Sequence, residues 1–132
     1  MTTVPIATHP RIDQGLCGAP VTVEPGRAEV RLVTTAAMAA DDQGLVHGGF
    51  VFGAVDYAAM LAVNHPNVVL GSAQVKFLRP VRVGEAVIAR ATAGEAQGKK
   101  RVVTVEAIRE GGEVVLAGEL VCFVLERHVL EG

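Results

Sequence analysis

The sequence is dominated by one apolar stretch, QGLVHGGFVFGAVDYAAMLAVNHP at residues 43–66, which carries a single acid, Asp56, near its middle. Its length and alanine-rich composition favour a helix over a strand, from about Gly48 to Asn64. The Asn64-His65-Pro66 triplet is a plausible stop signal. A helix that is apolar nearly all round must be covered on most sides. A buried, unpaired carboxylate costs several kcal/mol, so Asp56 is expected to have a specific role.

The remainder of the chain is predicted to supply strands that cover this helix. Residues 21–34, VTVEPGRAEVRLVT, read as a hairpin around a Pro-Gly turn, and four more strands are expected at about 68–79, 85–94, 100–109 and 113–125. Residues 1–19 are interrupted by proline and glycine and are expected to be an irregular surface segment. We therefore expect one domain over residues 1–132, in which a single antiparallel sheet curls around the helix.

Composition excludes several classes of protein. Twelve basic and fourteen acidic residues give a net charge of −2, which argues against nucleic-acid or membrane-surface binding. Cys17 and Cys122 lack the spacing of a zinc site, so no metal is expected. No signal peptide is visible, and the apolar stretch is too short to span a bilayer. The expected location is the cytoplasm.

The start of the predicted helix offers a second chemical feature. Its first N–H groups lack partners within the helix, and Gly48 and Gly49 would let a substrate carbonyl approach them closely. Gly49 and Asp56 lie seven residues apart, which places them on one helix face but about 10 Å apart along the axis. One carbonyl cannot easily meet both. Two antiparallel helices from two subunits would bring them together, so the spacing favours a dimer with composite sites.

Two motifs resemble a known family. HGGFVFGAVD, with an acid nine positions after His47, and VKFLRPVRVGEAVIARA at residues 75–91 are similar to segments of the hotdog-fold acyl-CoA thioesterases, especially the phenylacetate-pathway branch. The resemblance extends over about residues 20–126. It implies an α+β hotdog fold, in which a curved antiparallel sheet wraps a long central helix. It also implies a homodimer, and leaves a homotetramer open.

The resemblance assigns roles to residues of this chain. It implies hydrolysis of a small or medium acyl-CoA thioester, with Asp56 as base or nucleophile and the partner's Gly48 and Gly49 as donors to the oxyanion. Coenzyme A would be part of the substrate, and no separate cofactor is expected. His47 is expected to bond loop backbone and hold these donors in place, with proton transfer as the alternative. For Asp56 the alternative is a structural hydrogen bond that fixes the helix.

Two positions depart from the family pattern. Relatives commonly carry Asn or Gln six positions before the histidine, where this chain has Asp41, and many carry Ser or Thr one turn after the acid, where this chain has Met60. Both changes leave open a non-catalytic acyl-CoA binding or sensing protein. A dehydratase or hydratase is a third hypothesis, but DDQGLVHGG lacks the proline-rich loop of the dehydratases compared.

Other residues are candidates for substrate contacts. The basic hairpin QGKKR, together with Arg79, could bind the phosphates of coenzyme A, although such lysines also keep a sheet edge soluble. Aromatic and thioether side chains near the helix are candidates for the acyl pocket or for ordinary core. The candidate substrate-binding residues are Asp41, Phe50, Phe52, Met60, Phe77, Arg79, Lys99, Lys100 and Arg101.

Overall fold

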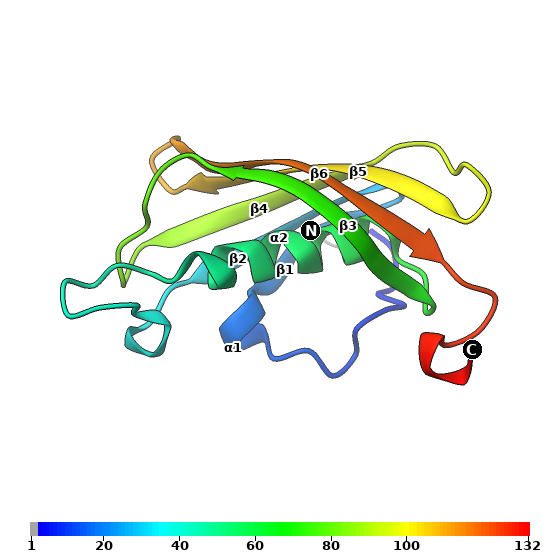
Figure 1. Cartoon of the computed structure of the whole chain (residues 1–132), viewed down its shortest axis with the longest axis horizontal. Coiled ribbons are helices and arrows are strands. Elements are labelled where there is room, and N and C mark those ends of the chain that lie inside the picture. Colours follow the sequence, from blue (N-terminus) through cyan, green and yellow to red (C-terminus); the bar gives the residue numbers. More distant parts are fainter. Residues whose placement is uncertain (1–2) are drawn as a thin grey trace.

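The computed structural model describes residues 3–132, in which a six-stranded antiparallel sheet curves over one long helix (Figure 1). The helices are α1 (Gln14–Cys17) and α2 (Gly48–Val63), with short 3-10 turns at Ala36–Met38 and Val129–Glu131. The strands are β1 (Ala19–Glu24), β2 (Arg27–Val33), β3 (Val68–Phe77), β4 (Ala86–Ala93), β5 (Lys100–Arg109) and β6 (Val114–Val124).

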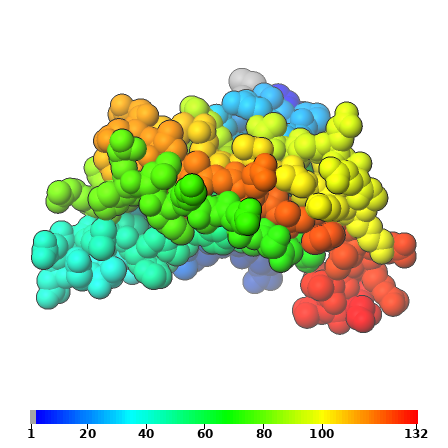
Figure 2. Space-filling model, turned by 45° about the horizontal axis from the view of Figure 1, so that its top comes forward, coloured from blue at the N-terminus to red at the C-terminus, as the bar shows by residue number. Residues whose placement is uncertain are grey.

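The order of strands across the sheet is β1-β2-β4-β5-β6-β3. Strand β2 pairs with β4, and β3, which follows α2 in the chain, pairs with β6 at the far edge. Strands β1 and β3 are therefore the two edges of the sheet. Figure 2 shows β3 on one face of the molecule, between the loop around residue 40 and the C-terminal segment.

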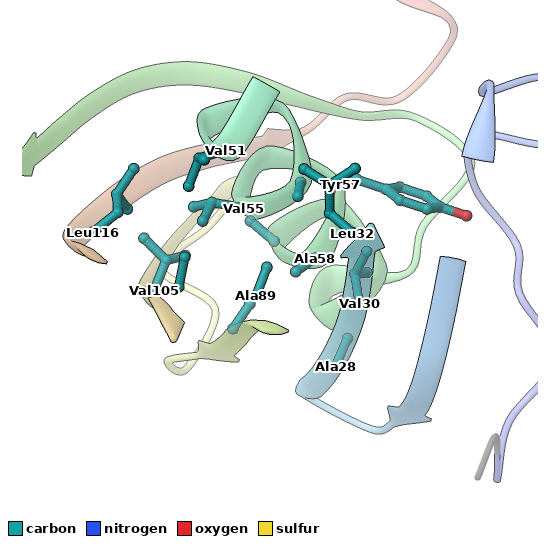
Figure 3. Close-up of a cluster of buried hydrophobic side chains, with 14 of the residues drawn as sticks. Ala28, Val30, Leu32, Val51, Val55, Tyr57, Ala58, Ala89, Val105 and Leu116 are labelled. Carbon is teal, nitrogen blue, oxygen red and sulfur yellow. The ribbon is translucent and has the colours of Figure 1, made fainter. Parts of the chain in front are cut away.

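Helix α2 packs into the concave side of this sheet. Figure 3 shows Val51 and Val55 pointing from the helix toward Val105 and Leu116, all of which are buried. Alanines on the same side, such as Ala58, let the backbone approach the strands closely. The aliphatic core predicted from the composition is confirmed, and the helix lies in it as a largely enclosed rod.

The helix ends where the sequence predicted. Asn64 adopts the left-handed conformation with φ 52°, and its N–H donates to the carbonyl of Met60. Its side chain then ties down the N-terminal segment, because Nδ2 donates to the carbonyl of Pro5 and Oδ1 accepts from the N–H of Ala7. Asparagine tolerates this backbone conformation better than most residues, so one residue ends the helix and anchors a distant segment.

The strands lie where the sequence predicted them, but the N-terminal segment differs from the irregular structure expected for it. The expected strands end within two residues of β3 to β6, and the Pro25-Gly26 turn joins β1 to β2. Residues 1–19 were expected to be irregular, but α1 forms within them and β1 begins at Ala19. Asp13 caps α1 by accepting from the N–H groups of Gly15 and Leu16. An aspartate directly before the helix was the available signal; residues 1–2 lie outside the described part.

Helix α1 lies beside α2 on the side away from the sheet (Figure 1). The N-terminal segment therefore covers part of the apolar helix that the sheet leaves open. In the described part of the chain, no helix is both long and apolar enough to cross a membrane.

We predict that Asn64→Ala destabilises the protein by about 1–2 kcal/mol, because it strains the left-handed backbone and removes two hydrogen bonds. Asn64→Gly should recover the backbone part of this loss, since glycine adopts the conformation freely. Urea denaturation measures both. Asn67→Ala, which removes a side chain with no recorded hydrogen bond, is the control. Equal stability of Asn64→Ala and Asn67→Ala would contradict the prediction.

Candidate active site

Asp56 lies on the flank of α2 that the fold leaves partly open. From Val51 to the end of the helix, only Phe52, Gly53, Asp56 and Val63 are not buried, and they share this flank. Oδ1 of Asp56 is nevertheless buried, and no donor among residues 3–132 forms a hydrogen bond with it. Because buried polar atoms almost always have a partner, Asp56 holds an acceptor that the single chain does not use.

The surroundings of Asp56 disfavour its charge. Burial raises the pKa of this carboxyl above its ordinary value, and no cation in the described residues forms an ion pair with it. A carboxylate with a raised pKa is a stronger base than one in water. The local chemistry therefore suits proton abstraction.

Two thiols lie near enough to Asp56 to respond to its charge. Burial raises the pKa of Cys17, and the charges of Asp13 and Asp56 raise it further. Burial also raises the pKa of Cys122 to about 11, with Asp56 adding to the shift and Arg101 opposing it. Both thiols are therefore protonated at neutral pH, and neither offers a thiolate nucleophile. Cys17 was not predicted to lie near Asp56, because residues 1–19 were expected to be irregular.

The start of α2 carries free backbone donors. The N–H groups of Gly48 and Gly49 have no recorded acceptor among residues 3–132, and Gly49 is exposed. A Cβ on Gly48 would lie 3.2 Å from the ring of Phe77, so glycine permits this close approach. Donors at a helix N-terminus also lie at the positive end of the helix dipole. This arrangement suits an oxygen that becomes negative.

The imidazole of His47 does not make the backbone hydrogen bonds expected from the sequence. Its ring makes no capping hydrogen bond, and lies edge-on to Phe50 with the ring centres 6.1 Å apart. Its backbone instead fixes the helix start, because its N–H donates to the carbonyl of Met38 at 2.9 Å. The expectation that the imidazole holds the loop is therefore not met in the single chain.

An apolar cavity of about 330 Å³ opens beside the helix start. Phe77, which is 57% exposed, lines it as the sequence suggested, whereas Phe50, Phe52 and Met60 do not. Arg79 also lines it, and its Nε lies 2.9 Å from Glu113. The other lining residues are Leu45, Val46, Gly48, Val51, Leu78, Pro80, Val81 and Val115.

The remaining candidates are dispersed. Asp41 folds the loop before the helix, since its Oδ1 accepts from the N–H groups of Gln43 and Leu45 at 2.9 and 3.2 Å. Met60 is buried one turn after Asp56, and Phe52 is half-buried one turn before it. The structure thus brings Arg79 and Phe77 to the helix start, but not Asp41 to Asp56.

The basic hairpin lies far from the helix start. Lys99 is in the β4–β5 turn and Lys100 begins β5, at the opposite end of the sheet from the β5–β6 turn (Figure 1). Arg101 is engaged in the hairpin itself, because its Nε donates to the carbonyl of Gly94 at 2.7 Å. Lys99 reaches Glu126 only at 4.0 Å. One subunit therefore does not combine these cations with Gly48. Residues 3–132 also contain no cluster of three or more potential metal ligands.

Comparison with known proteins identifies relatives of this chain. Residues 43–116 match the thioesterase superfamily. The chain is 57% identical over 114 residues to methylthioribose-1-phosphate isomerase from Aquifex aeolicus, covering 86% of this chain and 25% of the relative. It is 35% identical over 81 residues to transcription factor FapR from Shouchella clausii, covering 61% and 41%. The chain thus spans less than half the length of either curated relative.

Solved structures agree with the fold. A crystal structure of an uncharacterized protein from Pyrococcus horikoshii has 52% identity and a TM-score of 0.93, covering 96% of this chain and 97% of that one. A variant of the phenylacetic acid degradation protein PaaI from Thermus thermophilus has 29% identity and a TM-score of 0.77, covering 85% and 96%. The hotdog fold and the likeness to the phenylacetate-pathway branch are thereby confirmed.

We predict that Asp56→Asn raises the melting temperature at neutral pH. Burial raises the pKa of Asp56, so the folded state binds its proton more readily than the unfolded state does. The ionised carboxylate therefore destabilises the fold at high pH. This penalty should vanish as the pH falls below about 3.9, the ordinary pKa of Asp. Thermal melts over a pH series measure the difference in melting temperature between Asp56→Asn and the unmodified protein.

The exposed Asp42 provides the matched control, because Asp42→Asn changes a surface carboxylate and should leave the melting temperature nearly unchanged. A melting temperature for Asp56→Asn equal to or below that of the unmodified protein at neutral pH would show that the carboxylate has a stabilising partner.

Proposed function

Because the chain belongs to the thioesterase superfamily, we propose that it hydrolyses acyl-CoA thioesters with a small or medium acyl group. One observation carries this proposal: a carboxylate with a buried, unpartnered oxygen lies on the open flank of a helix whose first N–H groups are free beside an apolar cavity. Thioester hydrolysis needs a base for water, donors for the oxyanion and an apolar site for the acyl chain. These residues could supply all three.

In the proposed reaction, Asp56 takes a proton from water as the water oxygen attacks the thioester carbonyl. The N–H groups of Gly48 and Gly49 stabilise the negative charge that develops on the carbonyl oxygen. The carbon–sulfur bond then breaks, and the protonated Asp56 gives its proton to the sulfur, which leaves as the thiol of coenzyme A. The raised pKa of Asp56 favours the first step, since it makes the carboxylate a better proton acceptor.

A second subunit completes the site in this proposal. Gly49 and Asp56 lie about 10 Å apart along α2, so one substrate carbonyl cannot meet both in a single chain. The open flank of the helix, with the half-buried Phe52 and Val63, is apolar surface that a partner could cover. Strand β3 is an edge with mostly exposed residues, and such an edge readily pairs with another strand. We propose a homodimer with antiparallel helices; a tetramer of such dimers is compatible with it.

The substrate contacts follow from the same arrangement. Arg79, at the cavity beside the helix start, is proposed to contact the coenzyme A portion. Lys99 and Lys100 could reach the nucleotide phosphates only where a partner's hairpin approaches the site, since their own lies at the other end of the sheet.

A non-catalytic acyl-CoA sensor is the second candidate function. Met60 offers no hydroxyl one turn after Asp56, and the carboxylate of Asp41 is occupied in folding its own loop. One curated relative is a transcription factor. Measured turnover over a series of acyl-CoA chain lengths, with released thiol as the signal, separates the two candidates.

Asp56→Asn is expected to lower kcat by about a hundredfold or more, because it removes the base while preserving side-chain volume. Affinity for a non-hydrolysable acyl-CoA analogue should change little. Asp42→Asn is the matched control and should retain full turnover. If Asp56→Asn kept the activity of the unmodified protein, the carboxylate would not be the base.

Mixed dimers test whether the sites are shared. Asp56→Asn removes the base, and Gly48→Pro removes one donor at a position where a helix tolerates proline. Each variant should be inactive alone. A mixed dimer regains one site with both functions, so activity should appear when the two are unfolded, combined and refolded. Light scattering must show that both variants pair. Continued inactivity of the paired mixture would contradict the shared site.

A further inference from the structure

The loop between β3 and β4, residues 78–85, joins the cavity to the start of α2. Its residues Arg79, Pro80 and Val81 form part of the cavity wall. Val81 then accepts the N–H of Val46 at 2.9 Å, and Val83 donates to the carbonyl of Gly44 at 2.8 Å. The position of this loop therefore affects the wall of the cavity.

The same hydrogen bonds act on the helix start. Val46 lies two residues before Gly48, and the intervening His47 is held by two backbone bonds, with its N–H donating to Met38 and its carbonyl accepting from Phe50. A shift of residues 80–81 would thus be passed through Val46 to the N–H groups of Gly48 and Gly49. Loop 78–85 is the outer support of the proposed oxyanion donors.

Arg109, the last residue of β5, holds this loop. Its Nη2 donates to the carbonyl of Pro80, and its Nη1 donates to Glu113 at 2.8 Å. Its Nε lies 3.7 Å from Glu85, whose carboxylate accepts the N–H of Arg82 at 2.7 Å. The side chain is only 20% exposed. One guanidinium therefore joins the loop to the β5–β6 turn by a hydrogen bond at Pro80 and a longer ion pair at Glu85, where the buried Nε makes no hydrogen bond.

A planar guanidinium suits this task because it presents several donors at fixed angles, and can bond a carbonyl and a carboxylate at once. A lysine ammonium could retain one of these contacts. Thr34, directly after β2, supports the other part of the loop, since its hydroxyl bonds the carbonyls of Arg82 and Glu85 at 3.1 and 2.6 Å, but it makes no hydrogen bond to residues 78–81. Residues 78 and 79 are held separately, because the N–H groups of Leu78 and Arg79 donate to the carbonyl of Val115 at 2.8 and 3.3 Å. Arg109 therefore anchors the cavity-lining part of the loop at Pro80.

We propose that Arg109 is a positioning residue, which holds the helix-start donors through Pro80, Val81 and Val46. It does not line the cavity and touches no reacting group. The proposal rests on the proposed hydrolysis for its kinetic consequence, but its structural part can be measured without turnover. Small displacements of catalytic groups have large effects on rate, on the order of a hundredfold for 1 Å.

The kinetic test compares Arg109→Met, Arg109→Lys and Arg90→Met in the assembled protein. Arg109→Met keeps a long apolar stem and should lower kcat by about tenfold or more, with KM changed by less than about threefold, because donors that act in the transition state are displaced. Arg109→Lys should recover part of kcat. Arg90 pairs with Glu29 at 2.8 Å on the sheet and contacts no part of the loop, so Arg90→Met should retain kcat.

Amide hydrogen exchange gives the second readout. In Arg109→Met the N–H groups of Val46 and Val83 should exchange faster than in the unmodified protein, while amides of β4 such as Val87 keep their protection. Arg109→Lys should restore part of this protection. It also provides a second test if Arg109→Met fails to fold. Unchanged exchange at Val46, with kcat no lower than in Arg90→Met, would overturn the proposal. If the unmodified protein hydrolyses no thioester, the proposed function fails, and exchange alone decides the role of Arg109.

Discussion

The enclosure of one apolar helix governs the rest of this structure. Helix α2 has no polar face, so every side of it must be shielded from water. The curved sheet and the N-terminal segment cover most of its surface. The flank with Phe52 and Val63 remains partly open. A second copy of the chain could close it, since burying this apolar surface would offset part of the entropy lost on association. In such a dimer, the same contact would bury the open flank of α2 and assemble the shared site.

Asp56 is the one acidic residue in this apolar helix. Burial raises its pKa and leaves one oxygen without a donor, which lowers the stability of the fold. Strain of this kind persists where other interactions outweigh it, and it is common at functional sites. The free N–H groups of Gly48 and Gly49 are a second unmet requirement, of opposite polarity, at the start of the same helix. A bound thioester and water could satisfy both, which is the physical basis for regarding them as one site.

Elements with a local signal were predictable from the sequence, and contacts between distant segments were not. The Asn64-His65-Pro66 triplet marked the helix end, and alternating residues around Pro25-Gly26 marked the first hairpin. The carboxylate of Asp56 could be selected because it interrupts an apolar stretch. By contrast, Asp41 serves its own loop, and the position of the basic hairpin depends on the order of strands across the sheet. The hydrogen bond from Arg109 to Pro80 joins residues 29 positions apart, and no local sequence pattern predicts it.

The strand order also determines when the molecule can associate during synthesis. Strand β3 leaves the ribosome soon after α2, but its neighbour in the sheet is β6, the last strand of the chain. Until β6 emerges, β3 has no neighbour in the sheet, and an unpaired strand of an incomplete chain is prone to pair with other chains. The edge that would pair two subunits is therefore formed last. The interval before β6 is in place is therefore the stage at which this chain is most exposed to non-native pairing with another chain.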